Sequence, residues 1–295
     1  MTVVKTEQLH EDAFGLDTRP ANEIAALLAQ GQADAALAPG RALGAIAGAA
    51  AAMARSIRAG GTLHYVAAGS SGLMAAADAQ ELGGTFSIPS DQLRIHVAGG
   101  LPTGVEMPGD TEDDTDEIAA ALIDAGVTDS LITVSASGRT PYTLAAARIA
   151  KKKGATVIGI ANNAGAPLLG LSDHAILLGT PPELLSGSTR MGAGTAQKIA
   201  LNMLSTLMAV ILGHVHDGMM VNVRADNIKL RRRATGIVAK IANVTAARAE
   251  DALKAAEGEV KPAVLIAARD LTARDARALL AETDGYLRAA LARIT

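Results

Sequence analysis

Two short stretches of small, hydroxyl-bearing residues each follow an apolar run and precede a run of helical composition. They read "AAGSSG" (67–72), here called the first hydroxyl turn, and "SASGRTP" (135–141), the second hydroxyl turn. A helix that begins at such a turn presents free backbone N–H groups and the positive end of its dipole, and small residues let an anion approach. Hydroxyl groups add directional donors. The turns therefore predict phosphate binding, in the second turn by Ser135, Ser137, Gly138 and Thr140.

An ordinary strand-to-helix loop with an N-capping Ser or Thr is the alternative for each turn taken alone. Two such turns in one sheet, both at the carboxyl ends of strands, favour the phosphate interpretation. Neither turn matches the dinucleotide pattern GxGxxG or the P-loop pattern GxxxxGKS, so no nucleotide cofactor is expected.

A third candidate for anion binding is the stretch "LLSGSTRMGAGTAQK" (184–198). Ser186 and Ser188 precede a predicted helix there, and Arg190 and Lys198 offer positive charge. The alternative is a helix start whose first turn is softened by glycine.

One acid stands apart from the others, Glu81 in "DAQEL" (78–82), because the surrounding segment is apolar and rich in small residues. Partial burial there is expected to raise its pKa and to suit general acid catalysis. By contrast, the stretch "EMPGDTEDDTDEI" (106–118) holds seven acids. Most of these are expected to be solvated or to face the positive end of a helix dipole.

Histidines and basic residues give weaker signals. His214 and His216 form a His-x-His pair without a further ligand pattern, so no metal site is expected. The cluster "KLRRR" (229–233) is interpreted as the solvated face of a helix, with pairing to the acidic stretch or to phosphate as alternatives.

Short β-type runs alternate with helical runs of about 10–15 residues in the first two thirds of the chain. This alternation predicts an α/β fold with a doubly wound, mainly parallel five-stranded sheet and helices on both faces. In such sheets ligands bind beyond the carboxyl ends of the strands, where both hydroxyl turns fall. The expected strands are 62–68, 93–98, 130–136, 155–161 and 173–179.

Helical composition prevails outside the sheet. Residues 22–58 are expected to be helical with a break at Pro39-Gly40, and no strand is expected after residue 186. We predict a domain over 1–240, which includes an N-terminal helical segment, and a small helical C-terminal subdomain over 241–295.

Composition excludes several classes of protein. The net charge of −3 and the scarcity of aromatic residues (2 Phe, 3 Tyr, no Trp) argue against nucleic acid binding. There is no cysteine, so thiol chemistry and disulfides are excluded. The first residues do not resemble a signal peptide, and the apolar stretch 43–57 is too short to span a bilayer, so we expect no membrane association and a cytoplasmic location.

The combination of "AAGSSG", "SASGRTPY", "GSTRMGAGTAQK" and "DNIKLRRR" resembles the N-acetylmuramic acid 6-phosphate etherases, from about Thr6 to the C-terminus. These enzymes belong to the sugar isomerase (SIS) fold superfamily, in which the glucokinase regulatory protein is a relative. The resemblance implies an SIS-type sheet and a homodimer with sites near the interface.

Members of this family cleave the ether that links D-lactate to C3 of the sugar, by β-elimination of lactate and hydration of the unsaturated intermediate. The resemblance implies a carbon–oxygen lyase of cell-wall recycling that needs neither metal nor nucleotide. Its substrate would be a phosphorylated amino sugar, and its products N-acetylglucosamine 6-phosphate and D-lactate. One carboxylate removes the C2 proton and a second acid protonates the departing oxygen.

The resemblance also assigns residues to this chemistry. Glu81 matches the family's acid, and Glu112 matches its second glutamate, with Asp110 and Asp113 as alternatives. Contacts with the phosphate or the sugar are implied for Ser70, Ser71, Ser137, Gly138, Thr140, Ser186, Ser188 and Arg190.

Three departures from the family pattern concern the substrate. Leu73 stands where the family usually has Arg, and Gly192 where it has Lys, so two positive charges are missing. Gly83-Gly84 replaces a Pro-Pro pair and is expected to loosen the loop that holds the acid. A lyase or isomerase acting on a different sugar phosphate therefore remains an alternative, as does a non-catalytic sugar-phosphate sensor whose helical tail docks a partner.

Overall fold

The computed structural model describes residues 4–108 and 110–294, which form two compact units. The first unit is built from Met1–Ala79 and Asp91–Ser205, and the second from Gln80–Ser90 and Thr206–Thr295. Helices α3 (Gly69–Phe86) and α7 (Gly192–Ile211) each contribute residues to both units. The predicted domain boundary at residue 240 lies inside a helix of the second unit.

A five-stranded sheet forms the centre of the first unit, with the strand order β2-β1-β3-β4-β5. All four strand pairings are parallel, which confirms the predicted sheet. Side chains of the three central strands are almost wholly buried, as expected for a sheet covered on both faces. The strands are β1 (Leu63–Ala67), β2 (Leu93–Val97), β3 (Ser130–Ser135), β4 (Thr156–Ala161) and β5 (His174–Leu177).

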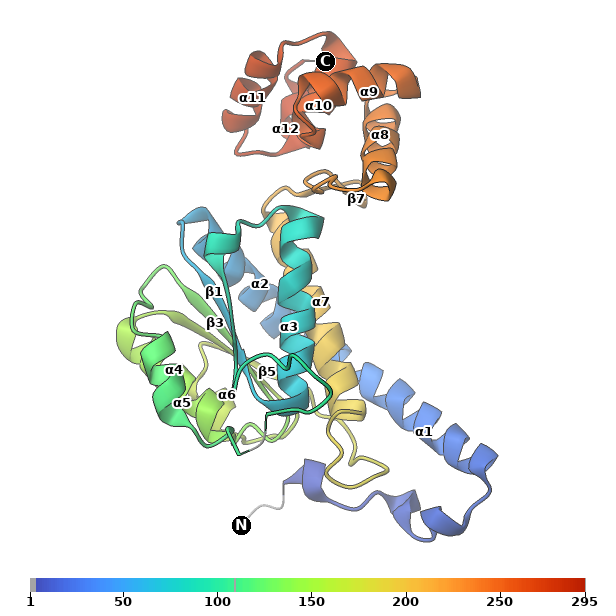
Figure 1. Cartoon of the computed structure of the whole chain (residues 1–295), viewed down its shortest axis with the longest axis vertical. Helices are drawn as coiled ribbons and strands as arrows, with labels where there is room; N and C mark the ends of the chain where they lie inside the picture. The colour runs from blue at the N-terminus through green and yellow to red at the C-terminus, as the bar shows by residue number, and fades with distance from the viewer. Residues whose placement is uncertain (1–3, 109, 295) are drawn as a thin grey trace. The chain divides into compact units, whose positions relative to one another are not determined.

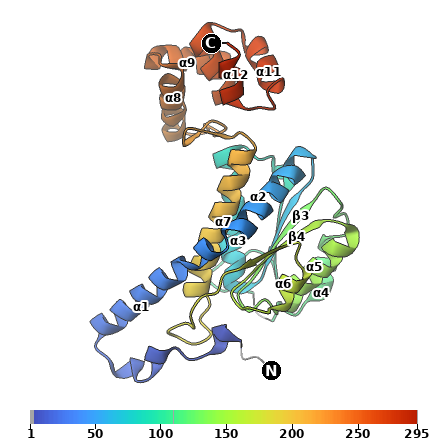
Figure 2. The same ribbon diagram turned by 180° about the vertical axis from the view of Figure 1, so that it is seen from behind.

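Helices cover both faces of this sheet, as Figures 1 and 2 show. Helix α2 (Leu43–Arg58) packs on one face against β1, β3 and β5. The other face is covered by α4 (Thr115–Ala121), α5 (Pro141–Lys153) and α6 (Pro167–Leu171). Alanines of α5 let the helix approach the strands closely, and the predicted doubly wound arrangement is confirmed.

The N-terminal segment is helical and broken at Pro39-Gly40, as predicted. Helix α1 (Ala21–Ala36) precedes the break and α2 follows it. Among the described residues no single helix has the length and hydropathy to cross a membrane, although the bent pair 21–41 and 43–58 passes that test by composition alone. The short 3-10 helices of the first unit are Lys5–Glu7, Glu11–Ala13, Leu16–Thr18 and Ala38–Arg41, with Ser90–Gln92 at the unit boundary.

The second unit is mainly helical, and its core consists of small and branched apolar side chains. Alanine, valine and leucine from all five of its C-terminal helices fill this core. The predicted helical C-terminus is therefore present. Its helices are α8 (Ile228–Ala242), α9 (Ala246–Ala255), α10 (Val260–Arg269), α11 (Ala273–Ala281) and α12 (Leu287–Ala292).

A short hairpin corrects the expectation that no strand follows residue 186. Strands β6 (Val215–His216) and β7 (Met219–Met220) pair antiparallel. Asp217 and Gly218, which connect them, both have positive φ angles of 46° and 74°. An Asp-Gly pair between apolar residues is the sequence signal of such a turn, so this hairpin was recognisable.

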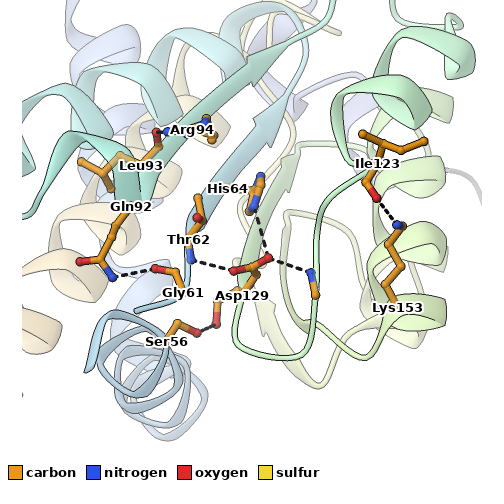
Figure 3. A network of polar contacts seen from close by, with 12 residues as sticks. Ser56, Gly61, Thr62, His64, Gln92, Leu93, Arg94, Ile123, Asp129 and Lys153 are labelled. Atoms are coloured by element: carbon orange, nitrogen blue, oxygen red, sulfur yellow. Dashed lines mark hydrogen bonds and ion pairs between the residues drawn. The ribbon is translucent and has the colours of Figure 1, made fainter. Parts of the chain in front are cut away.

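Polar side chains tie together the amino-terminal end of the sheet (Figure 3). Asp129 accepts hydrogen bonds from the backbone N–H groups of Thr62, at 2.7 Å, and Gly126, at 2.8 Å. Its carboxylate lies 3.9 Å from Nε2 of His64, whose Nδ1 is 3.0 Å from Nε2 of His96. The two rings stack, so this network holds the edge strand β2 to β1 and to the start of β3.

Acid should weaken this network. Burial, the His64 ring and the Arg94 guanidinium lower the pKa of His96 from 6.5 to about 4. Burial also lowers the pKa of His64, against the opposing effect of Asp129. Unfolded histidines bind protons first, so the stabilisation is complete above about pH 6.5 and is lost as the pH falls toward 4.

We therefore expect the His96→Gln variant, which does not titrate at this position, to lose less thermal stability between pH 7 and pH 4.5 than the native protein. The difference in the Tm decrease should be about 2–4 °C for a loss near 1 kcal/mol in a chain of this size. Calorimetry across that pH range measures it, and parallel Tm profiles of the two proteins would contradict the assignment.

Candidate functional site

The first hydroxyl turn leads directly from β1 into α3, which begins at Gly69. The N–H of Gly72 donates to the carbonyl of Ala68 at 3.1 Å and makes the first hydrogen bond of this helix. Ser70 is half-buried and Ser71 is buried in the same turn of helix. The structure thus places both hydroxyls beside the amide groups of a helix N-terminus.

The second hydroxyl turn uses its hydroxyl groups to satisfy its own backbone. Ser135 Oγ accepts from the N–H of Gly138 at 3.0 Å, and Ser137 Oγ accepts from the N–H of Arg139 at 3.1 Å. Ser135 Oγ also lies 2.9 Å from Thr140 Oγ1. Two amides are thus already paired and one hydroxyl proton is shared between Ser135 and Thr140, which leaves the remaining hydroxyl protons of the turn as donors for a ligand.

The second hydroxyl turn needs glycine at position 138 for two reasons, its backbone conformation and the lack of space for a side chain. The φ angle of Gly138 is 65°, a left-handed conformation that side chains with a Cβ rarely adopt. A Cβ at this position would lie 2.5 Å from the Cβ of Ala166 and 2.9 Å from that of Ala161. The tight turn therefore depends on glycine here.

Glu112 lies between the two hydroxyl turns. Its carbonyl accepts a hydrogen bond from the N–H of Tyr142, at 3.0 Å, in the first turn of α5. Its carboxylate approaches the first hydroxyl turn, because a Cβ built on Gly69 would lie 3.0 Å from Oε1. The register of β1 and β3, which pairs Ala67 with Val134, brings the two turns to the same edge of the sheet.

Other acids of the stretch 106–117 have different surroundings. Asp114 caps α4 by accepting from the N–H groups of Asp116, at 3.0 Å, and Glu117, at 3.1 Å. Glu117 accepts from the N–H of Gly99 at 3.3 Å. Asp113 is exposed. In the described part of this stretch, Glu112 is therefore the acid whose carboxylate lies beside the first hydroxyl turn.

The third candidate segment lies beside the N-terminus of the described chain. The hydroxyl of Ser186 donates to the carbonyl of Glu7 at 3.1 Å, and the residue is exposed. Asn163 connects this region to the second hydroxyl turn, because its amide donates to Thr6 Oγ1 at 3.2 Å and to the carbonyl of Ala136 at 2.9 Å. Thr6 and Glu7 therefore contact the segments that carry the second and third candidate anion sites.

Glu183 was missed by the sequence analysis. It is buried, and its carboxylate accepts from the N–H groups of Gly192, at 2.9 Å, and Ala193, at 2.8 Å. The N-terminus of α7 is therefore already occupied by a protein carboxylate. Of the residues predicted to bind an anion here, Ser188 is half-buried and Arg190 is exposed.

Asp78 is a second group that sequence reasoning did not single out. Its buried carboxylate accepts from Tyr65 Oη at 3.0 Å, Asn202 Nδ2 at 2.8 Å and Ser205 Oγ at 2.9 Å. Burial raises the pKa of Asp78, and these three donors partly offset that effect. The bonds join β1, α3 and α7 one helical turn before Glu81.

Glu81 belongs to the second unit and is exposed, so the expectation that it is partly buried is wrong. The helix turns its side chain toward a cavity of about 280 Å³, which Lys229 and Arg233 of α8 also line. Among residues 4–108 and 110–294, no group of three or more His, Asp or Glu side chains has the arrangement of a metal site.

Comparison with known proteins identifies the family. Residues 40–162 match the model of the SIS domain. The N-acetylmuramic acid 6-phosphate etherase of Deinococcus radiodurans is 41% identical over 289 residues, which cover 97% of this chain and 95% of that protein. The chain belongs to the N-acetylmuramic acid 6-phosphate etherase family. The enzyme of the same name from Streptomyces avermitilis is 40% identical over 294 residues, covering 99% and 94% of the two chains.

Solved structures share the fold of about two thirds of this etherase-family chain. A putative phosphosugar isomerase from Bacteroides fragilis has a TM-score of 0.51 at 22% identity and covers 68% of this chain and 95% of that one. A putative sugar-phosphate isomerase from Listeria monocytogenes has a TM-score of 0.50 at 16% identity, covering 65% and 92%. The predicted SIS-type fold is thereby confirmed.

The departures from the family pattern have structural explanations in two cases. Gly83 and Gly84 do not form a loop, because α3 continues through them to Phe86, and the expected loosening of a loop is wrong. A Cβ on Gly192 would lie 3.1 Å from Glu183 and 3.2 Å from Ala35, so the close approach of the capping carboxylate favours glycine. Leu73, which replaces an arginine, is 38% exposed on α3.

The Gly84→Ala variant should be more stable than the native protein. Gly84 is helical and exposed, and no atom lies within 4 Å of the position of an added Cβ. Alanine then reduces the backbone entropy lost on folding, and we expect a gain of about 0.5 kcal/mol in the free energy of unfolding. Urea denaturation measures this gain.

A matched control lies in the first turn of the same helix. A Cβ on Gly72 would lie 2.7 Å from Val97 Cγ1, so Gly72→Ala should destabilise the protein. A loss of stability in Gly84→Ala would show that Gly84 lacks either the helical conformation or the free space beside it that the structure shows.

Proposed function

We propose that the protein cleaves the ether between D-lactate and C3 of N-acetylmuramic acid 6-phosphate and releases N-acetylglucosamine 6-phosphate and D-lactate. Membership of the etherase family supports this activity. The observation that carries it in the structure is the position of Glu112, whose carboxylate lies against the first hydroxyl turn while its backbone holds the start of α5. A proton-transfer group is thus adjacent to groups suited to a phosphate.

The phosphate would bind to the hydroxyl turns. Ser70 and Ser71 offer hydroxyl and amide donors at the start of α3, and Ser137 and Thr140 offer hydroxyl donors before α5. Gly138 shapes the second turn. Ser186, Ser188 and Arg190 would approach the sugar from the third segment, although the hydroxyl of Ser186 is already donated to Glu7.

The reaction needs a base and an acid. Along α3 about 18 Å separates Gly69, which Glu112 approaches, from Glu81, so the two glutamates of one site would come from different subunits of the dimer. In the open-chain sugar, the C2 proton is acidified by the adjacent aldehyde, and Glu112 of one subunit would remove it while Glu81 of the other protonates the departing ether oxygen. The C3–O bond breaks, a C2–C3 double bond forms, and water then adds its hydroxyl at C3 and a proton at C2. This sequence is that of a carbon–oxygen lyase. It involves no net oxidation or reduction, so neither step requires an electron carrier.

A related reaction on another sugar phosphate is the second candidate. Leu73 favours it, because an apolar side chain on α3 stands where the family usually has a cation. Thermal shifts with a panel of hexose and hexosamine phosphates distinguish the candidates, since a ligand at 100 times its Kd adds about 2.7 kcal/mol of stability. The largest shift with a sugar that lacks the lactyl ether would favour this alternative.

Replacing either glutamate should abolish most of the activity. We expect kcat to fall by about 10²–10⁴-fold in Glu112→Gln and in Glu81→Gln, because each loses proton transfer and keeps its shape. Release of D-lactate from N-acetylmuramic acid 6-phosphate measures this effect. Asp113→Asn, which changes an exposed neighbour of Glu112, should retain native activity.

The two roles can be separated in deuterated water. Glu81→Gln should still exchange the C2 proton of the substrate with solvent, whereas Glu112→Gln should not. Native protein that forms no more lactate than the Glu81→Gln variant would refute the proposed function. Full activity of Glu112→Gln together with an inactive Asp113→Asn would assign the base to Asp113.

We further infer that the protein is a homodimer and acts in the cytoplasm in the recycling of cell-wall amino sugars. The N-terminal part of the first unit supports the dimer. Phe14 is 94% exposed, and Leu9, Leu37 and Leu43 are also exposed. Helix α1 projects from the layers of the sheet in both views (Figures 1 and 2), and a second copy would cover these apolar side chains.

Light scattering coupled to size-exclusion chromatography should therefore give the mass of two chains. Phe14→Ser should shift the protein toward the monomer at micromolar concentration, because it removes apolar area from the interface. Leu177→Ser, at an exposed leucine in β5, is the control and should leave the mass unchanged. A monomeric native protein would contradict the proposal.

A further inference from the structure

A cavity of about 520 Å³ lies within the second unit. Its volume is typical of sites for small molecules. One side is formed by the turn before α10 and the first residues of that helix, and another by the segment between β7 and α8. Both hydroxyl turns belong to the first unit, so this cavity is separate from the site proposed for the substrate phosphate. It is lined by Ser87, 221–226, 257–262, Leu280 and Gly285.

A buried ammonium group lies at the wall of this cavity. Lys261 is only 8% exposed, and its Nζ donates to the carbonyl of Gly285 at 2.9 Å. Both residues line the cavity. Among residues 4–108 and 110–294, no carboxylate forms an ion pair with this ammonium. A buried charge without an opposite charge is costly, so Lys261 would be stabilised by an anion.

The acids that line the cavity are engaged elsewhere. Glu257 and Glu259 both form ion pairs with Arg277, at 3.3 and 2.7 Å. Asp226 accepts from the side-chain amide of the next residue at 3.1 Å. Burial lowers the pKa of Lys261 from 10.5 to about 8, and no neighbouring acid offsets that effect. The lysine therefore pays for its burial without a negative partner.

The start of α10 adds donors to the same wall. Glu259 is the N-cap residue of this ten-residue helix, and its side chain does not cap the helix. Within the described part of the chain, the backbone N–H groups of Val260 and Lys261 donate no hydrogen bond. The positive end of the helix dipole thus lies beside the ammonium, and the exposed Arg224 adds another positive charge to the lining.

We propose that this cavity binds a small phosphorylated molecule, whose phosphate group pairs with Lys261 and with the amides at the start of α10. An ammonium group is a compact charge with three donors that rotate, which suits the tetrahedral phosphate, whereas a guanidinium fork suits a carboxylate. Amides at a helix N-terminus favour the same anion. The volume of the cavity leaves room for the organic part of the ligand.

Proton uptake on binding reports whether an anion reaches Lys261. Sulfate serves as the probe, because it is a tetrahedral dianion that does not titrate near pH 8. An anion favours the charged lysine, and about half of these side chains are neutral at pH 8. We expect the native protein to take up about half a proton per chain at pH 8 and about a tenth of a proton at pH 7. Calorimetric titration in two buffers of different ionisation enthalpy measures this uptake.

Three variants test the role of the lysine. Lys261→Met should lose the proton uptake and show a smaller increase of Tm with sulfate than the native protein. Lys261→Arg keeps the charge but does not titrate near pH 8, so it should retain the increase of Tm and lose the uptake. Lys240→Met, at an exposed lysine of α8 outside this cavity, is the control and should behave as the native protein does.

The proposal fails if the native protein takes up no proton with sulfate at pH 8, or if Lys261→Met takes up as much as the native protein. If Lys261→Met does not fold, Lys261→Arg decides, because native uptake in that variant would assign the titration to another group. Sulfate bound at the hydroxyl turns does not involve Lys261, and no turnover is needed. The outcome is therefore independent of the proposed function.

A second probe tests the class of ligand. Glycerol 3-phosphate, which is fully ionised at pH 8, should give the same proton uptake at a lower concentration than sulfate, because the cavity also accommodates its carbon chain. The reverse order of the two affinities would overturn the assignment to an organic phosphate.

Discussion

The alignment of β1 with β3 is the constraint on which the candidate site depends. Parallel strands in register end at the same edge of a sheet, and the pairing of Ala67 with Val134 brings both hydroxyl turns to that edge. Glu112 reaches both turns only because they are adjacent, with its carbonyl on α5 and its carboxylate on Gly69. A shift of one residue in this register would turn the buried side chains of either strand to the opposite face and separate the groups.

The two ends of the same sheet serve different purposes. At the amino end, Asp129 accepts from two backbone amides and lies 3.9 Å from His64, and the hydrogen bond between His64 and His96 links β1 to the edge strand β2. At the carboxyl end, hydroxyl groups keep protons to donate, and helices begin without an acidic side chain on their first amides. The exceptions are α4, whose first amides Asp114 caps, and α7, where Glu183 satisfies the amides of the first turn. The proposed phosphate-binding turns and the Asp129 network therefore lie at opposite edges of the sheet, which lets the turns vary without loss of the sheet.

Local patterns were enough to predict the sheet and most helices. Each of the five strands is a short apolar run next to a helical one, and Pro141 and Pro39-Gly40 mark a helix start and a break. Contacts between distant residues were not predictable. Glu183 caps a helix that begins nine residues later, and Gly83-Gly84 lies within α3, which ends in buried Phe86 and is followed by buried Ile88. The cavity beside Glu81 is likewise lined by residues of α8 that follow it by well over a hundred positions.

The distribution of positive charge gives the departures from the family pattern a chemical meaning. Glu183 fills the N-terminus of α7 beside Gly192, and Leu73 offers no charge, so in the proposed function the first unit would bind the phosphate chiefly through hydroxyls, amides and helix dipoles. In the proposed reaction the phosphate is unchanged from substrate to product, and its contacts stabilise ground state and transition state alike. The lactyl group is the part that departs, and its carboxylate is the charge whose surroundings change as the C3–O bond breaks. In the proposed reaction, interactions with the lactyl group therefore contribute to catalysis in a way that contacts with the phosphate would not.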